Sequence, residues 1–271
     1  MYRWILAIDL DRCLLDRRGE LSEANRLALS RAFSSGAAIV LATGRMNVGV
    51  KRVLAEVPPV AALVLLNGAL VIDQVTHQVI FEQALDPNSA KAIYSWCSKN
   101  DCRAVLCGKD SVSFVEIDNV IAEYLARTGA EAGIGRAPWM TDWPCYKALV
   151  YGLSDSLKLE AHVASALRSA EECSSYSIGM TGFGYVEVQA LGVGKDRGLG
   201  ILLSEATLRT LPLVTVGDGE RDVGMLRMTR HSYAVANASP DAMDAAEHVV
   251  DDCDHNGAAM AIMHFLDGSR S

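Results

Sequence analysis

The stretch WILAIDLDRCLL, residues 4–15, joins an uninterrupted apolar run to two carboxylates. Apolar residues from Trp4 to Ile8 are typical of a strand that is buried on both faces of a parallel sheet. Asp9 and Asp11 follow where this strand would end, and open α/β sheets bind their ligands at that end. In an extended segment both carboxylates would point to one side and repel each other unless a cation or a proton intervenes. Taken alone, the stretch fits either a solvated loop or a Mg²⁺ site with a carboxylate nucleophile.

Apolar strands and helices alternate outward from this stretch. Toward the C-terminal side of it, buried strands are expected at 37–42 and 61–66, with helices at 24–33 and 47–56. The alternation returns after residue 190, with a helix from Lys195 to Ser204 and a buried strand at 213–216. This order predicts an α/β fold built on a doubly wound, Rossmann-like parallel sheet with right-handed crossovers.

Residues 85–188 show a different pattern, in which hairpin-like strand pairs are mixed with helices. Paired strands are expected at 103–107 and 111–116, and residues 129–143 are expected to be irregular. This mixture indicates an α+β module inserted into the parallel sheet domain. The predicted division is therefore a core of residues 1–84 and 189–271 and an inserted domain of residues 85–188.

Composition excludes several classes of protein. Of the 271 residues, 50% are hydrophobic and 21% are charged, which is typical of a globular chain. The net charge of −8 argues against general binding to nucleic acid or an anionic membrane, but a bound divalent cation would still admit an anionic small substrate. No apolar run approaches a membrane span or a signal peptide, so a cytoplasmic protein is expected. The seven cysteines form no Cys-x-x-Cys pair, which favours buried reduced thiols.

Residues suited to phosphoryl transfer follow the other predicted strands. Thr43 ends the strand at 37–42, Lys195 introduces a helix, and Asp218 and Asp222 follow the strand at 213–216. A carboxylate that attacks a dianionic phosphate needs cationic help, which Mg²⁺ and a lysine supply, while a threonine hydroxyl donates a hydrogen bond. Each residue alone also fits a plain strand-to-helix turn or a solvated helix start. Their combination at neighbouring strand ends favours the catalytic interpretation.

Four short motifs resemble, in order and spacing, those of the haloacid dehalogenase-like (HAD) phosphatases. They are Asp9-Leu10-Asp11, Ala42-Thr43-Gly44-Arg45, Gly194-Lys195-Asp196 and Gly217-Asp218-x-x-x-Asp222. The large insert resembles the type IIB cap of the Cof-like branch, and Asn67-Gly68-Ala69 and Ala236-Asn237-Ala238-Ser239 resemble secondary motifs of that branch. The resemblance covers essentially the whole chain.

The resemblance implies a role for each matching residue. Asp9 is expected to be the nucleophile, and Asp11 the general acid/base whose backbone carbonyl also binds Mg²⁺. Thr43 and Lys195 are expected to hold the phosphoryl group, and Asn237 to help support the pocket. The implied catalytic residues are Asp9, Asp11, Thr43 and Lys195; the phosphate-binding residues are Thr43, Gly44, Asn67, Lys195 and Arg221; the metal residues are Asp9, Asp11, Asp218 and Asp222. Asp222 is expected either to support the metal shell or to orient Lys195.

Three positions depart from the family pattern, namely Arg12, Cys13 and Arg221. Arg12 lacks the permissive backbone of the usual glycine, and Arg221 places a fixed cation near the expected metal site. The expected function is a Mg²⁺-dependent phosphatase that hydrolyses phosphate monoesters of small metabolites, such as sugar phosphates, through an aspartyl-phosphate. The alternative is a degenerate family member that binds a phosphorylated ligand in a regulatory role. A small phosphorylated metabolite is the expected partner, and the chain is expected to be a monomer or homodimer.

In the insert, two features leave the choice between binding and structure open. Residues 179–184 are glycine-rich and fit either a substrate-contacting loop or a simple hairpin turn. Trp139, Trp143 and Tyr146 fit either stacking on a substrate ring or packing in the core of the insert.

Overall fold

The computed structural model describes residues 2–114, 117–134, 144–152, 156–169, 176–181, 185–204 and 208–268. The chain divides into two compact units. We call residues 1–44, 51–82 and 194–271 the core unit, and residues 45–50 and 83–193 the insert unit.

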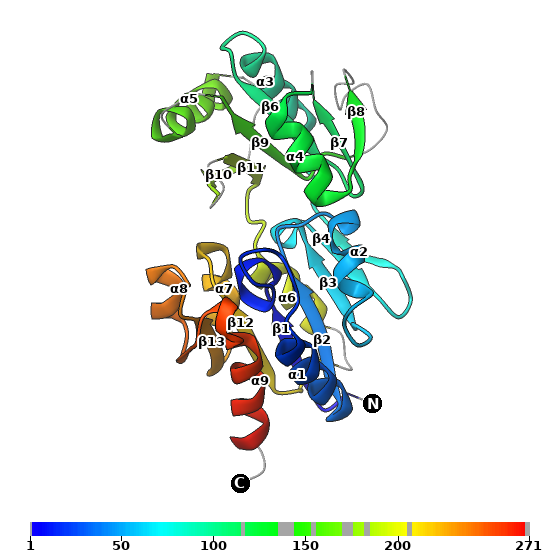
Figure 1. The fold of residues 1–271 in the computed structure, drawn as a ribbon. Helices are drawn as coiled ribbons and strands as arrows, with labels where there is room; N and C mark the ends of the chain where they lie inside the picture. The colour runs from blue at the N-terminus through cyan, green and yellow to red at the C-terminus, as the bar shows by residue number, and fades with distance from the viewer. Residues whose placement is uncertain are drawn as a thin grey trace. The chain divides into compact units, whose positions relative to one another are not determined.

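The core unit is built on a sheet of eight strands in the order β14-β13-β12-β1-β2-β3-β4-β5 (Figure 1). Six strands are parallel, which confirms the expected parallel sheet. They are β1 (Trp4–Ile8), β2 (Ala37–Ala42), β3 (Ala62–Leu65), β12 (Leu213–Gly217), β13 (His231–Val235) and β14 (His248–Val250). The hairpin of β4 (Leu70–Asp73) and β5 (Val79–Glu82) extends the β3 edge in antiparallel fashion.

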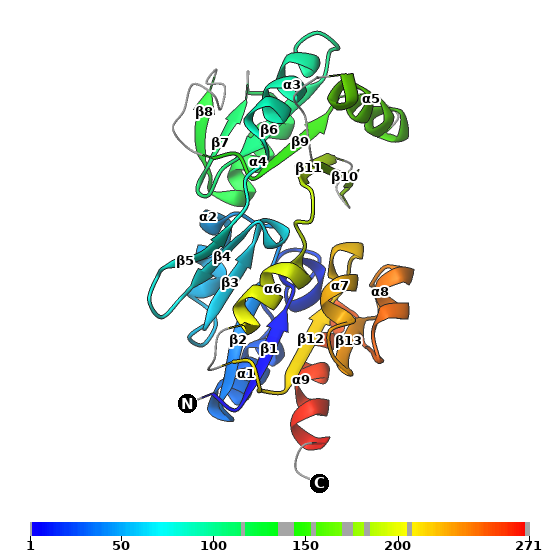
Figure 2. The ribbon, with the colours of Figure 1, turned by 180° about the vertical axis from the view of Figure 1, so that it is seen from behind.

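Helices cover both faces of this sheet, as in a doubly wound fold (Figures 1 and 2). The helices of the core unit are α1 (Glu23–Ser34), the second half of α2 (Asn47–Leu54), α6 (Lys195–Leu203), α7 (Val223–Leu226), α8 (Pro240–Ala245) and α9 (Gly257–Gly268). On one face, Leu199 and Leu202 of α6 pack with Ile5 and Val40 of the central strands. The opposite face meets α9, where the rings of Trp4 and Phe265 lie 4.7 Å apart. The central strands are therefore apolar throughout because both of their faces are covered.

Local signals place the ends of α1 as the sequence indicates. The side chain of Ser22 accepts a hydrogen bond from the backbone N–H of Asn25 and caps the first turn. The following strand begins directly after Gly36, whose φ of 93° turns the chain out of the helix. The short connection from α1 to β2 thereby allows β2 to pair in parallel with β1.

The insert unit has its own sheet and its own core. Its strand order is β10-β11-β9-β6-β7-β8. The strands are β6 (Arg103–Cys107), β7 (Ser111–Phe114), β8 (Glu131–Ile134), β9 (Lys147–Tyr151), β10 (Tyr176–Met180) and β11 (Val186–Ala190), and the helices are α3 (Pro87–Cys97), α4 (Asn119–Thr128) and α5 (Ser156–Ser169). Residues of α3 and α5, including Ile93 and Val163, pack against one sheet face. The α/β fold class with an inserted α+β module is thus confirmed.

One stretch of the insert differs from the sequence-based expectation. Residues 131–134, expected to be irregular, form β8, which pairs in parallel with β7. This pairing is a long-range contact, and a short glycine-containing segment carries little local signal for it. Residues 135–143 lie outside the described part of the chain. Among the described residues, no helix is long and apolar enough to cross a membrane.

Candidate active site

Four neighbouring strands of the core unit bring the predicted site residues to one edge of the sheet. β12, β1, β2 and β3 are adjacent, and Asp218, Asp9, Thr43 and Asn67 follow their carboxyl ends. Backbone bonds continue beyond the strands: Asp9 N donates to Val216 O at 3.0 Å, and Asn67 N donates to Thr43 O at 3.0 Å. Because these parallel strands end at the same edge of the sheet, they bring residues that are far apart in the chain into one site.

Lys195 lies at the first turn of α6 and reaches two carboxylates. Its Nζ donates to Oδ1 of Asp9 at 2.6 Å and to Oδ1 of Asp222 at 2.7 Å. All three side chains are almost completely buried. Because a buried ammonium needs compensating charge, these two ion pairs fix where Lys195 can lie.

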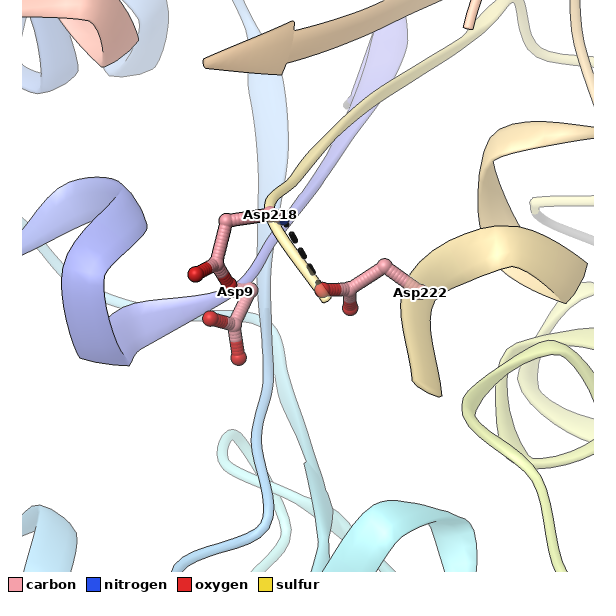
Figure 3. A group of neighbouring side chains, drawn as sticks. All are labelled: Asp9, Asp218 and Asp222. Carbon is pink, nitrogen blue, oxygen red and sulfur yellow. Dashed lines mark hydrogen bonds between the residues drawn. The ribbon is translucent and has the colours of Figure 1, made fainter. Parts of the chain in front are cut away.

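Asp222 also holds the backbone of the loop that carries Asp218. Its Oδ2 accepts hydrogen bonds from the backbone N–H of Asp218 at 3.0 Å and of Gly219 at 2.9 Å, the first of which is drawn in Figure 3. Gly217 makes this approach possible, since a Cβ atom there would lie only 2.6 Å from Cβ of Asp222. The sequence alone did not indicate this role of Gly217. Asp222 thus orients Lys195 with one oxygen and the Asp218 loop with the other.

The charges of the site are not balanced by the protein groups alone. Burial raises the pKa of Asp9 well above its usual value, and the negative charges of Asp222 and Asp218 add to the rise that Lys195 opposes. Burial and then Asp222 raise the pKa of Asp218 to about 6. Burial opposes the charge of Lys195, but Asp222 and Asp9 hold the pKa of its ammonium above the usual value. The site therefore favours an additional positive charge beside Asp9 and Asp218.

This carboxylate group fits a divalent cation. Asp9, Asp218 and Asp222 each offer a carboxylate oxygen, and these atoms all lie within 4.8 Å of one another (Figure 3). Hard cations such as Mg²⁺ prefer oxygen ligands from one or two carboxylates. When ionised, the three carboxylates outnumber the ammonium of Lys195, and the nearby charge of Arg12 only partly opposes the rise in the pKa of Asp218, so a divalent ion would supply further compensation. Asp11, predicted to bind the metal through its backbone carbonyl, contributes no carboxylate to this group.

The chain leaves its extended path directly after Asp9. Residues Leu10–Leu14 form a turn closed by two backbone hydrogen bonds, from Leu14 N–H to Asp9 O at 3.2 Å and from Leu15 N–H to Leu10 O at 2.8 Å. Asp11 itself keeps an extended backbone, with φ −73° and ψ 122°, but it lies inside this turn and not in a strand. Asp11 is half-buried and Cys13 is fully buried. Arg12 adopts a left-handed backbone with a φ of 61°. The turn that carries the expected acid/base is thus defined by backbone geometry and not by strand alternation.

Asn237 fastens this turn from a neighbouring loop. Its Nδ2 donates to the carbonyl of Arg12 at 2.8 Å, and its Oδ1 accepts from the backbone N–H of Cys253 at 2.7 Å. The expected supporting role of Asn237 therefore has a specific geometry: it joins two loops that follow different strands.

The remaining predicted residues divide between the core unit and the insert unit. Thr43 and Asn67 are buried, and a Cβ atom at Gly44 would lie 2.8 Å from Oδ1 of Asn67. Arg221 is half-buried in the short turn Glu220–Asp222. In the insert unit, Tyr146 is buried. Trp139, Trp143 and residues 182–184, singled out in the sequence, lie outside the described residues.

Comparison with known proteins shows the relatives of this chain. The sequence model of the haloacid dehalogenase-like hydrolase family matches residues 6–262. Among curated proteins, a 5-amino-6-(5-phospho-D-ribitylamino)uracil phosphatase of Bacillus subtilis is 25% identical to this chain. The alignment is 292 residues long with its gaps and covers 97% of this chain and 98% of that protein. The match extends over almost the full length of both chains, so it includes the insert as well as the core.

Solved structures show the same fold at lower identity. A haloacid dehalogenase-like hydrolase from Bacteroides thetaiotaomicron matches with a TM-score of 0.84 and 21% identity, covering 98% of this chain and all (100%) of that one. A structure described as a HAD subclass IIB sugar phosphatase matches with a TM-score of 0.82 and 19% identity, covering 97% and 98% of the two chains. Both structures therefore share the fold of this chain over the core and the insert alike.

Proposed function

The chain belongs to the haloacid dehalogenase-like hydrolase family, and on that premise we propose a Mg²⁺-dependent phosphatase that hydrolyses phosphate monoesters of small metabolites through an aspartyl-phosphate. The observation that carries this proposal is the buried array in which Lys195 bridges Asp9 and Asp222 beside Asp218. The ammonium of Lys195 can donate hydrogen bonds to a dianionic phosphoryl group, and the carboxylates beside it can bind the metal that such a group requires.

Asp9 performs the first chemical step. One of its carboxylate oxygens attacks phosphorus, the bond from phosphorus to the ester oxygen breaks, and the leaving oxygen takes a proton from Asp11. A water oxygen then attacks the phosphorus of the aspartyl-phosphate while Asp11 accepts a proton from that water. The bond between phosphorus and the Asp9 oxygen breaks, which releases inorganic phosphate and restores the Asp9 carboxylate and the protonated Asp11.

Thr43 and Lys195 hold the transferring phosphoryl group. Lys195 contributes a buried point charge whose position Asp222 maintains, and Thr43 contributes a hydroxyl donor. Asp9 and Asp218 would hold Mg²⁺, with the backbone carbonyl of Asp11 as a further oxygen ligand. When bound, the ion neutralises charge on the phosphate and on Asp9, which otherwise repel each other. Asp222, whose two oxygens already accept protein hydrogen bonds, supports the metal shell from outside.

Substrates are expected among phosphorylated metabolites of modest size. The curated relative from Bacillus subtilis is named for a phosphorylated ribitylaminouracil, and one solved neighbour for sugar phosphates. Both names point to phosphate monoesters with polar leaving groups. We propose that the insert unit acts as the cap that selects the leaving group, with the sequence-based division at residues 84/85 and 188/189.

Activity toward p-nitrophenyl phosphate and a panel of metabolite phosphate esters, assayed with MgCl₂, tests the proposal. Wild-type protein should turn over p-nitrophenyl phosphate and at least one metabolite ester, and EDTA should abolish the activity. Asp9→Asn should lower kcat at least ~1,000-fold, since loss of a nucleophile costs several powers of ten. Asp244→Asn, the same substitution at an exposed position of α8, is the matched control and should retain wild-type kcat. A wild-type protein that hydrolyses no ester of the panel would contradict the proposal.

Arg12, Cys13 and Arg221 motivate a second candidate, a ligand-binding protein without turnover. The left-handed backbone of Arg12 supports the catalytic alternative, because the turn after Asp9 keeps a glycine-type conformation despite the arginine. Arg221→Asn separates the two candidates. Equal activity in wild type and variant supports the enzyme, whereas activity that appears only in the variant supports the degenerate protein.

A further inference from the structure

Three consecutive residues at the carboxyl end of β3 have a left-handed backbone. The φ angles are 52° for Leu66, 57° for Asn67 and 97° for Gly68. Leu66 is fully buried, and a bulky residue in this region costs on the order of 1–3 kcal/mol unless its surroundings impose it. A strained turn of this kind is retained only where contacts with neighbouring segments hold it in place, so those contacts indicate its role.

One side of the turn is bonded to the segment that carries Thr43. The backbone N–H of Asn67 donates to Thr43 O at 3.0 Å. The side chain of Asn67 lies over Gly44, where a Cβ atom would be 2.8 Å from Oδ1. The turn is thereby held at a fixed distance from the end of β2.

The other side of the turn touches the beginning of α6. A Cβ atom at Gly68 would overlap the carbonyl oxygen of Gly194 and would lie 3.2 Å from the backbone nitrogen of Lys195. From the helix side, a Cβ atom at Gly198 would lie 3.1 Å from Cα of Gly68. The contact is therefore backbone against backbone, and its separation leaves no room for a methyl group.

We propose that the turn Leu66–Gly68 is a spacer that sets the position of Lys195 relative to Thr43, and that Gly68 is a positioning residue which acts through Lys195. This inference rests on the proposed function, in which Thr43 and Lys195 hold the same phosphoryl group. Groups that bind one phosphate must be placed within about 0.5 Å. A methyl group at position 68 would push the Lys195 end of α6 away from the turn, because both Gly68 and Gly194 are held there by backbone.

The test compares Gly68→Ala with wild type by thermal shift and by steady-state kinetics. Inorganic phosphate, added in the presence of MgCl₂, should bind Gly68→Ala about 10-fold or more weakly, and kcat for p-nitrophenyl phosphate should fall about 10- to 100-fold, since small displacements at a reacting centre carry losses of this size. MgCl₂ alone should still stabilise the variant, because the backbone of Asp9 and Asp218 follows β1 and β12 and not the turn, even though Lys195 bonds to Asp9. General distortion of the site would weaken both ligands, and that result would overturn the inference.

Gly200→Ala is the matched control in the same helix. A Cβ atom there meets no other atom within 4 Å, so phosphate affinity and kcat should equal those of wild type. If Gly68→Ala does not fold, Gly198→Ala presses on the turn from the helix side, where a Cβ atom would lie 3.1 Å from Cα of Gly68 and 2.8 Å from Cγ1 of Val64 in β3. It should weaken phosphate binding without weakening Mg²⁺ binding, and unchanged phosphate affinity in that variant would overturn the inference.

Failure of the inference and failure of the proposed function give different results. A wild-type protein that neither hydrolyses esters nor binds phosphate with Mg²⁺ refutes the proposed function. An active wild type together with a Gly68→Ala variant that has wild-type kcat and phosphate affinity refutes the spacer alone.

Discussion

Arg12 stands three residues after Asp9 with a φ of 61°, in the left-handed region that glycine occupies without cost. The carbonyl of Arg12 is held by Asn237, and the N–H of Leu15 bonds back to Leu10 across the turn at 2.8 Å. These bonds impose the conformation on a residue that does not favour it. The sequence correctly marked Arg12 as a departure beside Asp9, but local propensity could not show that the turn survives it.

Arg12→Gly should therefore stabilise the fold, and Arg12→Ala should not. Alanine keeps the left-handed strain without the guanidinium group, so the glycine variant should be more stable than the alanine variant by about 1 kcal/mol. Urea unfolding followed by circular dichroism measures the difference. An alanine variant at least as stable as the glycine variant would show that position 12 carries no strain.

At the scale of elements, the insert unit contains a buried ion pair that the sequence did not indicate. Lys147 of β9 and Glu187 of β11 approach to 3.3 Å, with side chains only 8% and 5% exposed. The strand register places Leu149 opposite Glu187 and Lys147 opposite Gln189. The pair therefore lies on the face of the sheet opposite to the face that packs against α3 and α5. Long-range strand pairing creates it, and neither residue carries a local signal.

Removing one partner of this pair should be costly, whereas removing both should not. Lys147→Met and Glu187→Leu should each destabilise the protein by about 3–5 kcal/mol, because a buried charge loses its ion-pair partner, while the double variant should regain most of that loss. Urea unfolding of the four proteins gives the coupling. Glu23→Gln, which breaks an exposed pair with Arg26 on α1, is the control and should change little. Additive losses in the double variant would mean that the two charges do not compensate each other.

At the scale of the whole molecule, the family and the enzyme class predicted from four motifs are confirmed. The haloacid dehalogenase-like family model covers almost the entire chain, and the curated relative over its full length is named a phosphatase, a phosphoric monoester hydrolase. The roles of individual site residues, the identity of the cation as Mg²⁺, the oligomeric state and the cellular compartment stay predictions.

Metal binding should couple the site to the stability of the fold. Wild-type protein at a Mg²⁺ concentration of 100 times Kd should gain about 2.7 kcal/mol, or roughly 5–10 °C in Tm. Asp218→Asn should lose this gain. In EDTA, however, the variant should melt at or above the Tm of wild type, because it removes a carboxylate that burial and Asp222 disfavour. Thermal melts with and without MgCl₂ decide the point.

Asp244→Asn serves as the control for these melts, since it removes an exposed carboxylate on α8 and should keep the full Mg²⁺ effect. An Asp218→Asn variant that still gains several degrees from MgCl₂ would exclude Asp218 as a metal ligand.

Periodicity and residue chemistry in the sequence by themselves predicted four of the six parallel strands, the helices between them, the inserted module and the candidate set Asp9, Thr43, Lys195 and Asp218. These features are local: apolar runs define buried strands, and polar residues at their ends mark the edge where parallel strands converge. Only the tertiary structure decided how Lys195 is held, which oxygens Asp222 uses, and why Gly68 and Gly217 carry no side chain. The contacts of Lys195 and Gly68 join segments far apart in the chain and arise when the sheet and α6 pack, whereas those of Gly217 and Asp222 arise from the fold of the loop after β12. For the stretch after Asp9, the sequence predicts the chemistry from the residue types, whereas the tertiary contact with Asn237 sets the conformation of the backbone.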